Sequence, residues 1–88
     1  MNSRNDAVTD RLARLVDRLL GPEVRLPEPF PVDQQLSDLG VTSLKMVNLM
    51  LAVEMEFDIM IAPGEITPEN FHSVVTIARL VDLTLAAR

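Results

Sequence analysis

The sequence predicts an all-α fold, a small four-helix bundle of three main helices and one short helix with a long first loop. Apolar residues recur at helical spacing in three segments, four prolines crowd residues 22–31, and no segment alternates apolar and polar residues as a strand would. The 88 residues are expected to form one domain over 1–88, because cores divide only near ~250 residues.

The first helix is predicted over residues 6–20, with Asp6 as its N-cap. Its apolar stripe consists of Val8, Leu12, Leu15, Val16, Leu19 and Leu20. Arg11, Arg14 and Arg18 share the polar face, where we expect solvated side chains. A glycine-proline pair then ends the helix.

Residues 21–35 are predicted to form a long loop, because four prolines prevent both helix and central strand. Phe30 is expected to anchor this loop to the core, and later segments must hold it in place. Leu36 and Leu39 should face inward from a short helical turn, and Gly40 allows a sharp change of direction.

The second main helix is predicted over residues 43–57, with Ser43 at its N-terminus as a candidate N-cap. One apolar stripe is typical of a core-facing side: Met46, Leu49, Met50, Val53 and Phe57. A second stripe lies nearly opposite: Leu44, Val47, Leu51 and Met55. Such a helix is either buried all round, with the proline loop covering part of the second stripe, or carries an exposed docking face. A chain of 88 residues has too few elements to cover this helix on every side, so the exposed docking face is favoured.

Three elements are predicted to follow: a loop over 58–64, a short helix over 67–71 and a last helix over 74–86. Ile59 and Ile61 should anchor the loop in the core. Thr67 is predicted to cap the short helix, and Ser73 to cap the last one. The last helix has an inner stripe of Val74, Ile77, Ala78, Val81 and Leu85.

The charge balance excludes several classes of function. Thirteen acidic and eight basic residues give a net charge of −5, which argues against nucleic-acid binding. No apolar run approaches the ~20 residues of a membrane span, and the first residues lack the apolar stretch of a signal peptide. We therefore expect a cytoplasmic monomer with no nucleic-acid and no membrane partner.

The residues that carry chemistry are few. Cysteine is absent, and His72 is the single histidine, so neither a metal site nor a catalytic residue is predicted. Glu54 and Glu56 lie about 200° apart around their helix and cannot act as an acid–base pair. Ser43 remains: a phosphate esterified at a helix N-terminus would be electrostatically favoured. Alternatively, Ser43 is only a helix cap.

Residues 39–57, LGVTSLKMVNLMLAVEMEF, resemble the acyl carrier and peptidyl carrier protein family. That family shows an L-G-x-D-S-L motif, followed by a helix with spaced hydrophobic residues that ends near E-x-x-F. The likeness extends upstream over 33–40 and downstream over 66–74, and covers about residues 8–85. It implies an acyl-carrier-like fold.

The resemblance implies that Ser43 carries 4′-phosphopantetheine, next to Thr42 and Leu44, and that the chain is a free-standing carrier and no enzyme. The arm would hold an acyl or aminoacyl group as a thioester. Implied partners are a phosphopantetheinyl transferase, an ATP-dependent acyl- or amino-acid:carrier ligase, and a downstream acyltransferase, synthase or thioesterase. Implied docking residues are Leu44, Lys45, Val47, Asn48, Leu51, Glu54 and Met55.

The chain departs from the family at two places. Thr42 replaces the aspartate that commonly precedes the serine. Lys45, Asn48 and Met55 stand where fatty-acid carriers bear acids, which indicates apolar docking and a specialised aminoacyl or unusual acyl cargo rather than housekeeping fatty-acid synthesis. The alternative is an unmodified helical adaptor that binds partners through the same helix. A small hydrolase that uses Ser43 is the least favoured hypothesis.

Overall fold

The structure is a computed structural model that describes residues 3–22, 24 and 30–87. Its elements in chain order are α1 (Ser3–Leu20), a 3₁₀ helix (Leu36–Leu39), α2 (Ser43–Phe57), a second 3₁₀ helix (Pro63–Glu65) and α3 (Val74–Ala86). These described residues contain no strand, so the predicted all-α class is confirmed. The bounds of α2 and α3 are those predicted from the sequence.

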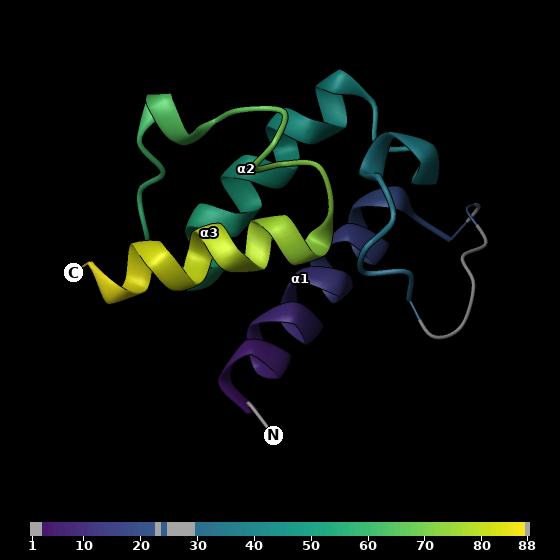
Figure 1. The fold of residues 1–88 in the computed structure, drawn as a ribbon. Coiled ribbons are helices and arrows are strands. Elements are labelled where there is room, and N and C mark those ends of the chain that lie inside the picture. Colours follow the sequence, from purple (N-terminus) through teal and green to yellow (C-terminus); the bar gives the residue numbers. More distant parts are fainter. Residues whose placement is uncertain (1–2, 23, 25–29, 88) are drawn as a thin grey trace.

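The three α-helices enclose one apolar core. In the view of Figure 1, α3 lies in front, α2 is above and behind it, and α1 is below; α1 contacts both other helices. Every helix and the first 3₁₀ helix contribute fully buried side chains: Leu12, Val16, Leu36, Leu49, Val53, Val74, Ile77 and Val81. The periodic stripes of the sequence therefore correctly identify the sides of the helices that face the core.

The first helix begins earlier than predicted. It starts at Ser3, so Asp6 lies inside its first turns and the predicted N-cap is wrong. No proline or glycine occurs between Ser3 and Asp6, and nothing in this polar stretch prevents a helix. The end of the helix at Leu20 is as predicted, and Gly21 follows it with a φ of 87°.

Arg11 is not merely a solvated residue on the polar face of α1. Its Nε donates to Glu56 Oε2 at 2.9 Å, and its Nη2 donates to the Glu56 carbonyl oxygen at 2.9 Å. The guanidinium also stacks over the Phe57 ring, 4.5 Å from its centroid. This single side chain thus ties α1 to the last turn of α2.

Replacing Arg11 with alanine is expected to lower the free energy of unfolding by about 1 kcal/mol, the sum of a modest exposed ion pair and a cation–π contact. Chemical denaturation measures the change. Arg14→Ala is the matched control, because Arg14 is exposed on the same helix and has no ion pair in the described part of the chain. If the two variants lost equal unfolding free energy, Arg11 would not stabilise the contact between α1 and α2.

The long first loop is held by the segment that leads into α3. Of residues 21–35, residue 23 and residues 25–29 lie outside the described ones. Phe30 is half-buried and packs against the core, as predicted. The backbone N–H of Leu36 donates to the His72 carbonyl at 2.8 Å, and that of Val75 donates to the Val32 carbonyl at 2.9 Å.

The predicted short helix over residues 67–71 is wrong. This segment is a single turn in which the Thr67 hydroxyl and carbonyl oxygens accept from the N–H groups of Asn70 and Phe71, both at 3.1 Å. The turn does not continue as a helix, because Ser73 adopts the extended backbone of the N-cap of α3, with φ −150° and ψ 170°. The 3₁₀ helix Pro63–Glu65 begins within the loop predicted over residues 58–64 and ends one residue beyond it, and the sequence pattern did not predict this helix. Ser73 does cap α3, through a reciprocal capping box with Thr76.

Candidate functional site

The approach to α2 is a sharp turn built by residues 36–41. Leu36 and Leu39 are buried, and Val41 N–H donates back to the Leu36 carbonyl at 3.1 Å. Gly40 makes this reversal possible with a φ of 105°, a conformation that side chains with a Cβ rarely adopt. Leu36, Leu39 and Val41 anchor this turn in the core, and the turn fixes where α2 begins.

Thr42, not Ser43, is the N-cap of α2. The Thr42 hydroxyl accepts from the Lys45 N–H at 3.3 Å, and its carbonyl accepts the first helical bond from the Met46 N–H at 2.8 Å. Both residue types are good caps, so the sequence alone could not choose between two adjacent candidates. Because Thr42 is the N-cap, Ser43 is the first helical residue. The Ser43 hydroxyl is therefore not needed to cap the N-terminus of α2.

The Ser43 side chain is exposed, and within residues 3–22, 24 and 30–87 no hydrogen bond involves its hydroxyl. The N–H groups of Ser43 and Leu44 belong to the first turn and have no acceptor within the helix. Together with the positive end of the helix dipole, they favour an anion at this position. The site can therefore hold a phosphate ester on an accessible hydroxyl.

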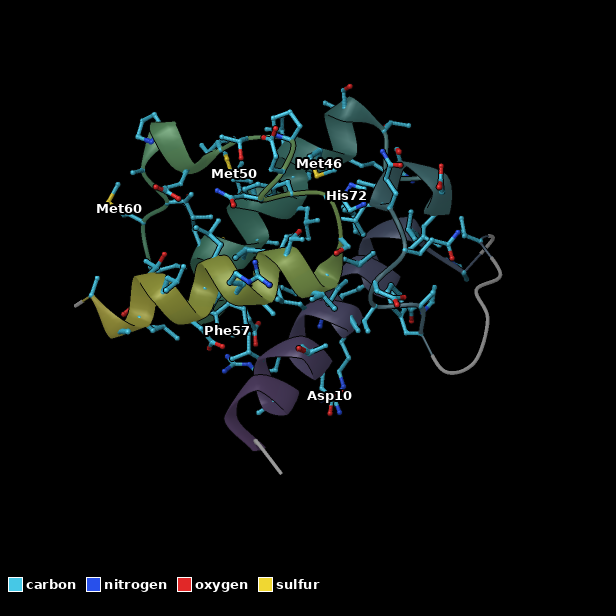
Figure 2. All side chains as sticks on the ribbon, viewed as in Figure 1. Asp10, Met46, Met50, Phe57, Met60 and His72 are labelled. Carbon is cyan, nitrogen blue, oxygen red and sulfur yellow. The ribbon has the colours of Figure 1, made fainter. Side chains whose placement is uncertain are left out.

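A groove of about 370 Å³ opens beside Ser43. It lies between the first half of α2 and the segment that precedes α3, where Figure 2 labels Met46 and Met50. Its apolar lining consists of Val41, Met46, Val47, Met50, Ile66, Pro68 and Phe71. A group attached to Ser43 would start at the rim of this apolar surface.

The second apolar stripe of α2 is exposed, as predicted. Its members, which we call the outer stripe, have exposed fractions of 73% for Leu44, 52% for Val47, 48% for Leu51 and 84% for Met55. The opposite stripe is the core side, with Leu49, Val53 and Phe57 buried and with Met46 and Met50 half-buried. Four of the seven residues predicted for docking thus form an apolar face that begins next to Ser43.

The other predicted docking residues differ in their surroundings. Asn48 is exposed, and Lys45 is half-buried. Glu54 is half-buried at one edge of the outer stripe, and its Oε2 accepts from the Ile61 N–H at 2.8 Å. Glu54 therefore fixes the loop that follows α2, a role that no local sequence pattern indicates.

None of the described helices is long and apolar enough to cross a membrane. Across the same residues, no three His, Asp or Glu side chains converge in a way that could hold a metal ion. His72 is exposed. Its backbone carbonyl oxygen accepts a hydrogen bond from the Leu36 N–H.

Comparison with known proteins identifies related chains. The family model "Phosphopantetheine attachment site" matches residues 10–83. Aminoacyl carrier protein 1 of Bradyrhizobium diazoefficiens is 46% identical over 81 residues, 92% of this chain and 89% of the relative. Aminoacyl carrier protein 2 of the same organism is 49% identical over 74 residues, 84% of this chain and 82% of the relative.

Chains in two solved structures are also similar to this chain. One similar chain comes from the crystal structure of Bradyrhizobium japonicum glycine:[carrier protein] ligase complexed with glycylated carrier protein. That chain is 42% identical, with a TM-score of 0.61, over 90% of this chain and 99% of its own length. A second similar chain comes from the crystal structure of B. japonicum glycine:[carrier protein] ligase complexed with cognate carrier protein and an analogue of glycyl adenylate. It is 38% identical, with a TM-score of 0.61, and the match covers 99% of this chain and 100% of its own length. The chain therefore belongs to the phosphopantetheine-binding family of carrier proteins.

Proposed function

We propose that the chain is an aminoacyl carrier protein with 4′-phosphopantetheine attached to Ser43. The observation that carries the proposal is the accessible hydroxyl of Ser43, which has no hydrogen bond to any described residue. It lies at the first position of α2, inside the segment that matches the family model. When attached, the group supplies a terminal thiol that holds the cargo as a thioester. The chain itself has no cysteine that could do so.

The residues around Ser43 fit this group. The Thr42 hydroxyl accepts from the Lys45 N–H and so fixes the first turn of α2, in which Ser43 is the first residue. The N–H groups of Ser43 and Leu44 are in place to donate to phosphate oxygens, and the helix dipole favours the added negative charge. In the reaction of a phosphopantetheinyl transferase with coenzyme A, Ser43 Oγ would bond to phosphorus, the hydroxyl proton would pass to the transferase, and adenosine 3′,5′-bisphosphate would leave.

An amino acid is the proposed cargo. Two relatives at 46% and 49% identity are named aminoacyl carrier proteins, and a structure with a similar chain is described as containing a glycylated carrier protein. The loading partner is then an ATP-dependent amino-acid:carrier ligase, and a downstream acyltransferase, synthase or thioesterase would remove the cargo. The carrier contributes no catalytic residue to these steps.

The outer stripe and Asn48 are the proposed docking surface for these partners. Apolar side chains as exposed as Leu44 and Met55 are costly in water, and a partner that covers them gains hydrophobic stabilisation. The surface begins beside Ser43, so a partner docked there lies close to the attachment point. The adaptor hypothesis rested on the missing aspartate before Ser43, and the capping role of Thr42 offers another account of that residue.

The test of this function is a loading experiment. The chain is first converted to the modified form with a phosphopantetheinyl transferase and coenzyme A. It is then incubated with ATP, a mixture of amino acids and the B. japonicum glycine:[carrier protein] ligase, and the intact mass is measured. We expect a gain of one aminoacyl residue that neutral hydroxylamine removes. A carrier that is never aminoacylated, but accepts fatty acids from a fatty-acid ligase, would contradict the proposal.

A further inference from the structure

Helix α3 has one face that remains largely exposed. Val75, Arg79 and Ala86 are exposed on it, and Asp82 is half-buried. At 100° per residue these four positions fall within an arc of about 60°, and we call them the free face of α3. The free face shares no residue with the outer stripe of α2 or with the groove beside Ser43. It is therefore a surface for which the proposed function gives no role.

The two charged residues of the free face have no partner among the described residues. The Arg79 guanidinium makes no ion pair and no hydrogen bond with them. Asp82 Oδ1 is buried and accepts no hydrogen bond from them. A carboxylate oxygen held away from water without a donor is unfavourable, so a cation placed beside Asp82 would offset part of this cost.

The free face has the same spacing when it is read in either direction. Its members are separated by four, three and four residues, which is the spacing of side chains that interlock between packed helices. Two copies of α3 can lie antiparallel, with a two-fold axis between positions 80 and 81. Arg79 of each copy then faces Asp82 of the other, and Val75 of each copy faces Ala86 of the other. In this register every charge meets its opposite, and no like charges are paired.

The same register also places an exposed leucine over a pocket. Leu83 is 63% exposed. Beside it, a pocket of about 280 Å³ lies between α1 and α3, with Thr9 on the side of α1 and Ala78 on the side of α3. Positions 83 and 78 face each other across the axis, so Leu83 of each copy lies opposite the pocket of the other. The apolar side chain and the pocket that would receive it thus belong to one face.

We propose that two copies of this chain associate through the free face of α3, antiparallel about this two-fold axis. An interface in which the same surface of both copies takes part closes at the dimer. The symmetric order of the charges selects a second copy as the occupant, because an unrelated partner would require no such symmetry. Ser43 and the outer stripe remain outside the interface, so each dimer carries two attachment points.

The proposed dimer is weak. One pair of short helices buries an area at the low end of specific interfaces, so we expect half of the chains to be paired near about 300 μM. At lower concentration the chain is the monomer that the sequence predicts. Association should weaken as salt is added, because the two facing charge pairs are screened.

The test uses two charge reversals that should fail alone and succeed together. Arg79→Asp gives a free face with two acids, and Asp82→Arg gives one with two bases. Sedimentation velocity measures association up to about 500 μM, a range suited to a weak interface. We expect each variant alone to dimerise about tenfold or more weakly than wild type, and their equimolar mixture to dimerise at least as tightly as wild type.

Arg14→Asp is the matched control for Arg79→Asp. It makes the same change of charge at an exposed residue of α1 that has no ion pair within the described residues. Its dissociation constant should stay within about twofold of wild type. Circular dichroism verifies that every variant is folded.

A second pair of variants does not depend on a change at Asp82. Leu83→Asp should abolish the dimer, because the charge replaces the side chain that enters the pocket. Leu44→Asp should leave the dimer unchanged, since Leu44 is 73% exposed on the outer stripe and lies outside the interface.

Several results would overturn the proposal. One is a wild type that stays monomeric up to about 500 μM, and another is a mixture that associates no better than the single variants. Loss of the dimer in Leu44→Asp but not in Leu83→Asp would place the interface on the outer stripe. Intact mass after incubation with a phosphopantetheinyl transferase and coenzyme A is recorded on the same samples. A monomeric chain that gains the arm would contradict the dimer and leave the proposed function unchanged.

Discussion

Replacing Ser43 with alanine is expected to abolish attachment of phosphopantetheine and to leave stability within about 0.5 kcal/mol of wild type. Alanine is a good helix former, the Ser43 side chain is exposed, and Thr42 provides the cap. Loss of a true N-cap would instead cost about 1 kcal/mol. Intact mass after incubation with a transferase and coenzyme A measures the modification, and chemical denaturation measures the stability.

Ser37→Ala is the matched control for this variant. Ser37 is also exposed and lines the same groove, so it is an accessible hydroxyl close to the proposed site. We expect Ser37→Ala to gain one arm, as the wild type does. An arm on Ser43→Ala would show that another hydroxyl accepts the group, and a marked loss of stability would show that Ser43 has a structural role.

Two leucines on opposite sides of α2 should respond in opposite ways to substitution. Leu49 is 0% exposed, so Leu49→Ala should cost about 2–5 kcal/mol of unfolding free energy through lost burial and a cavity. Leu51 is 48% exposed, so Leu51→Glu should change stability by less than about 1 kcal/mol. The same change should weaken ligase binding about tenfold or more, because it places a charge within the outer stripe, which is part of the proposed docking surface.

Denaturant titrations and binding measurements on both variants check this pair. Met55→Glu should behave as Leu51→Glu does, since Met55 is 84% exposed on the same stripe. If Leu51→Glu unfolds the chain, the outer stripe belongs to the core. If it folds and binds the ligase normally, partners dock elsewhere.

The helices and their core sides could largely be predicted from the sequence, because local periodicity determines both. The range 43–57 follows from an unbroken helical pattern after Gly40, and the last helix begins at the expected cap, Ser73. The opposition of two apolar stripes on one helix correctly indicated an exposed face. The start of α1 was missed because a polar stretch carries no apolar periodicity.

The finer features of the site could not be predicted from the sequence. They depend on contacts between residues distant in sequence, or on which of two equally suitable residues caps a helix. The pairing of Arg11 with Glu56 spans 45 residues, and the bond from Ile61 to Glu54 requires the path of a loop. Thr42 and Ser43 are both competent caps, and only the backbone geometry decides between them.

The central claim is that Ser43 carries the arm through which the chain holds its cargo. Its most direct test is peptide mass spectrometry on the protein purified from its native host, with fragmentation that locates the modification. The account predicts phosphopantetheine on Ser43 of the peptide that contains it, with an aminoacyl group on part of the population. A native population in which Ser43 is never modified would contradict it.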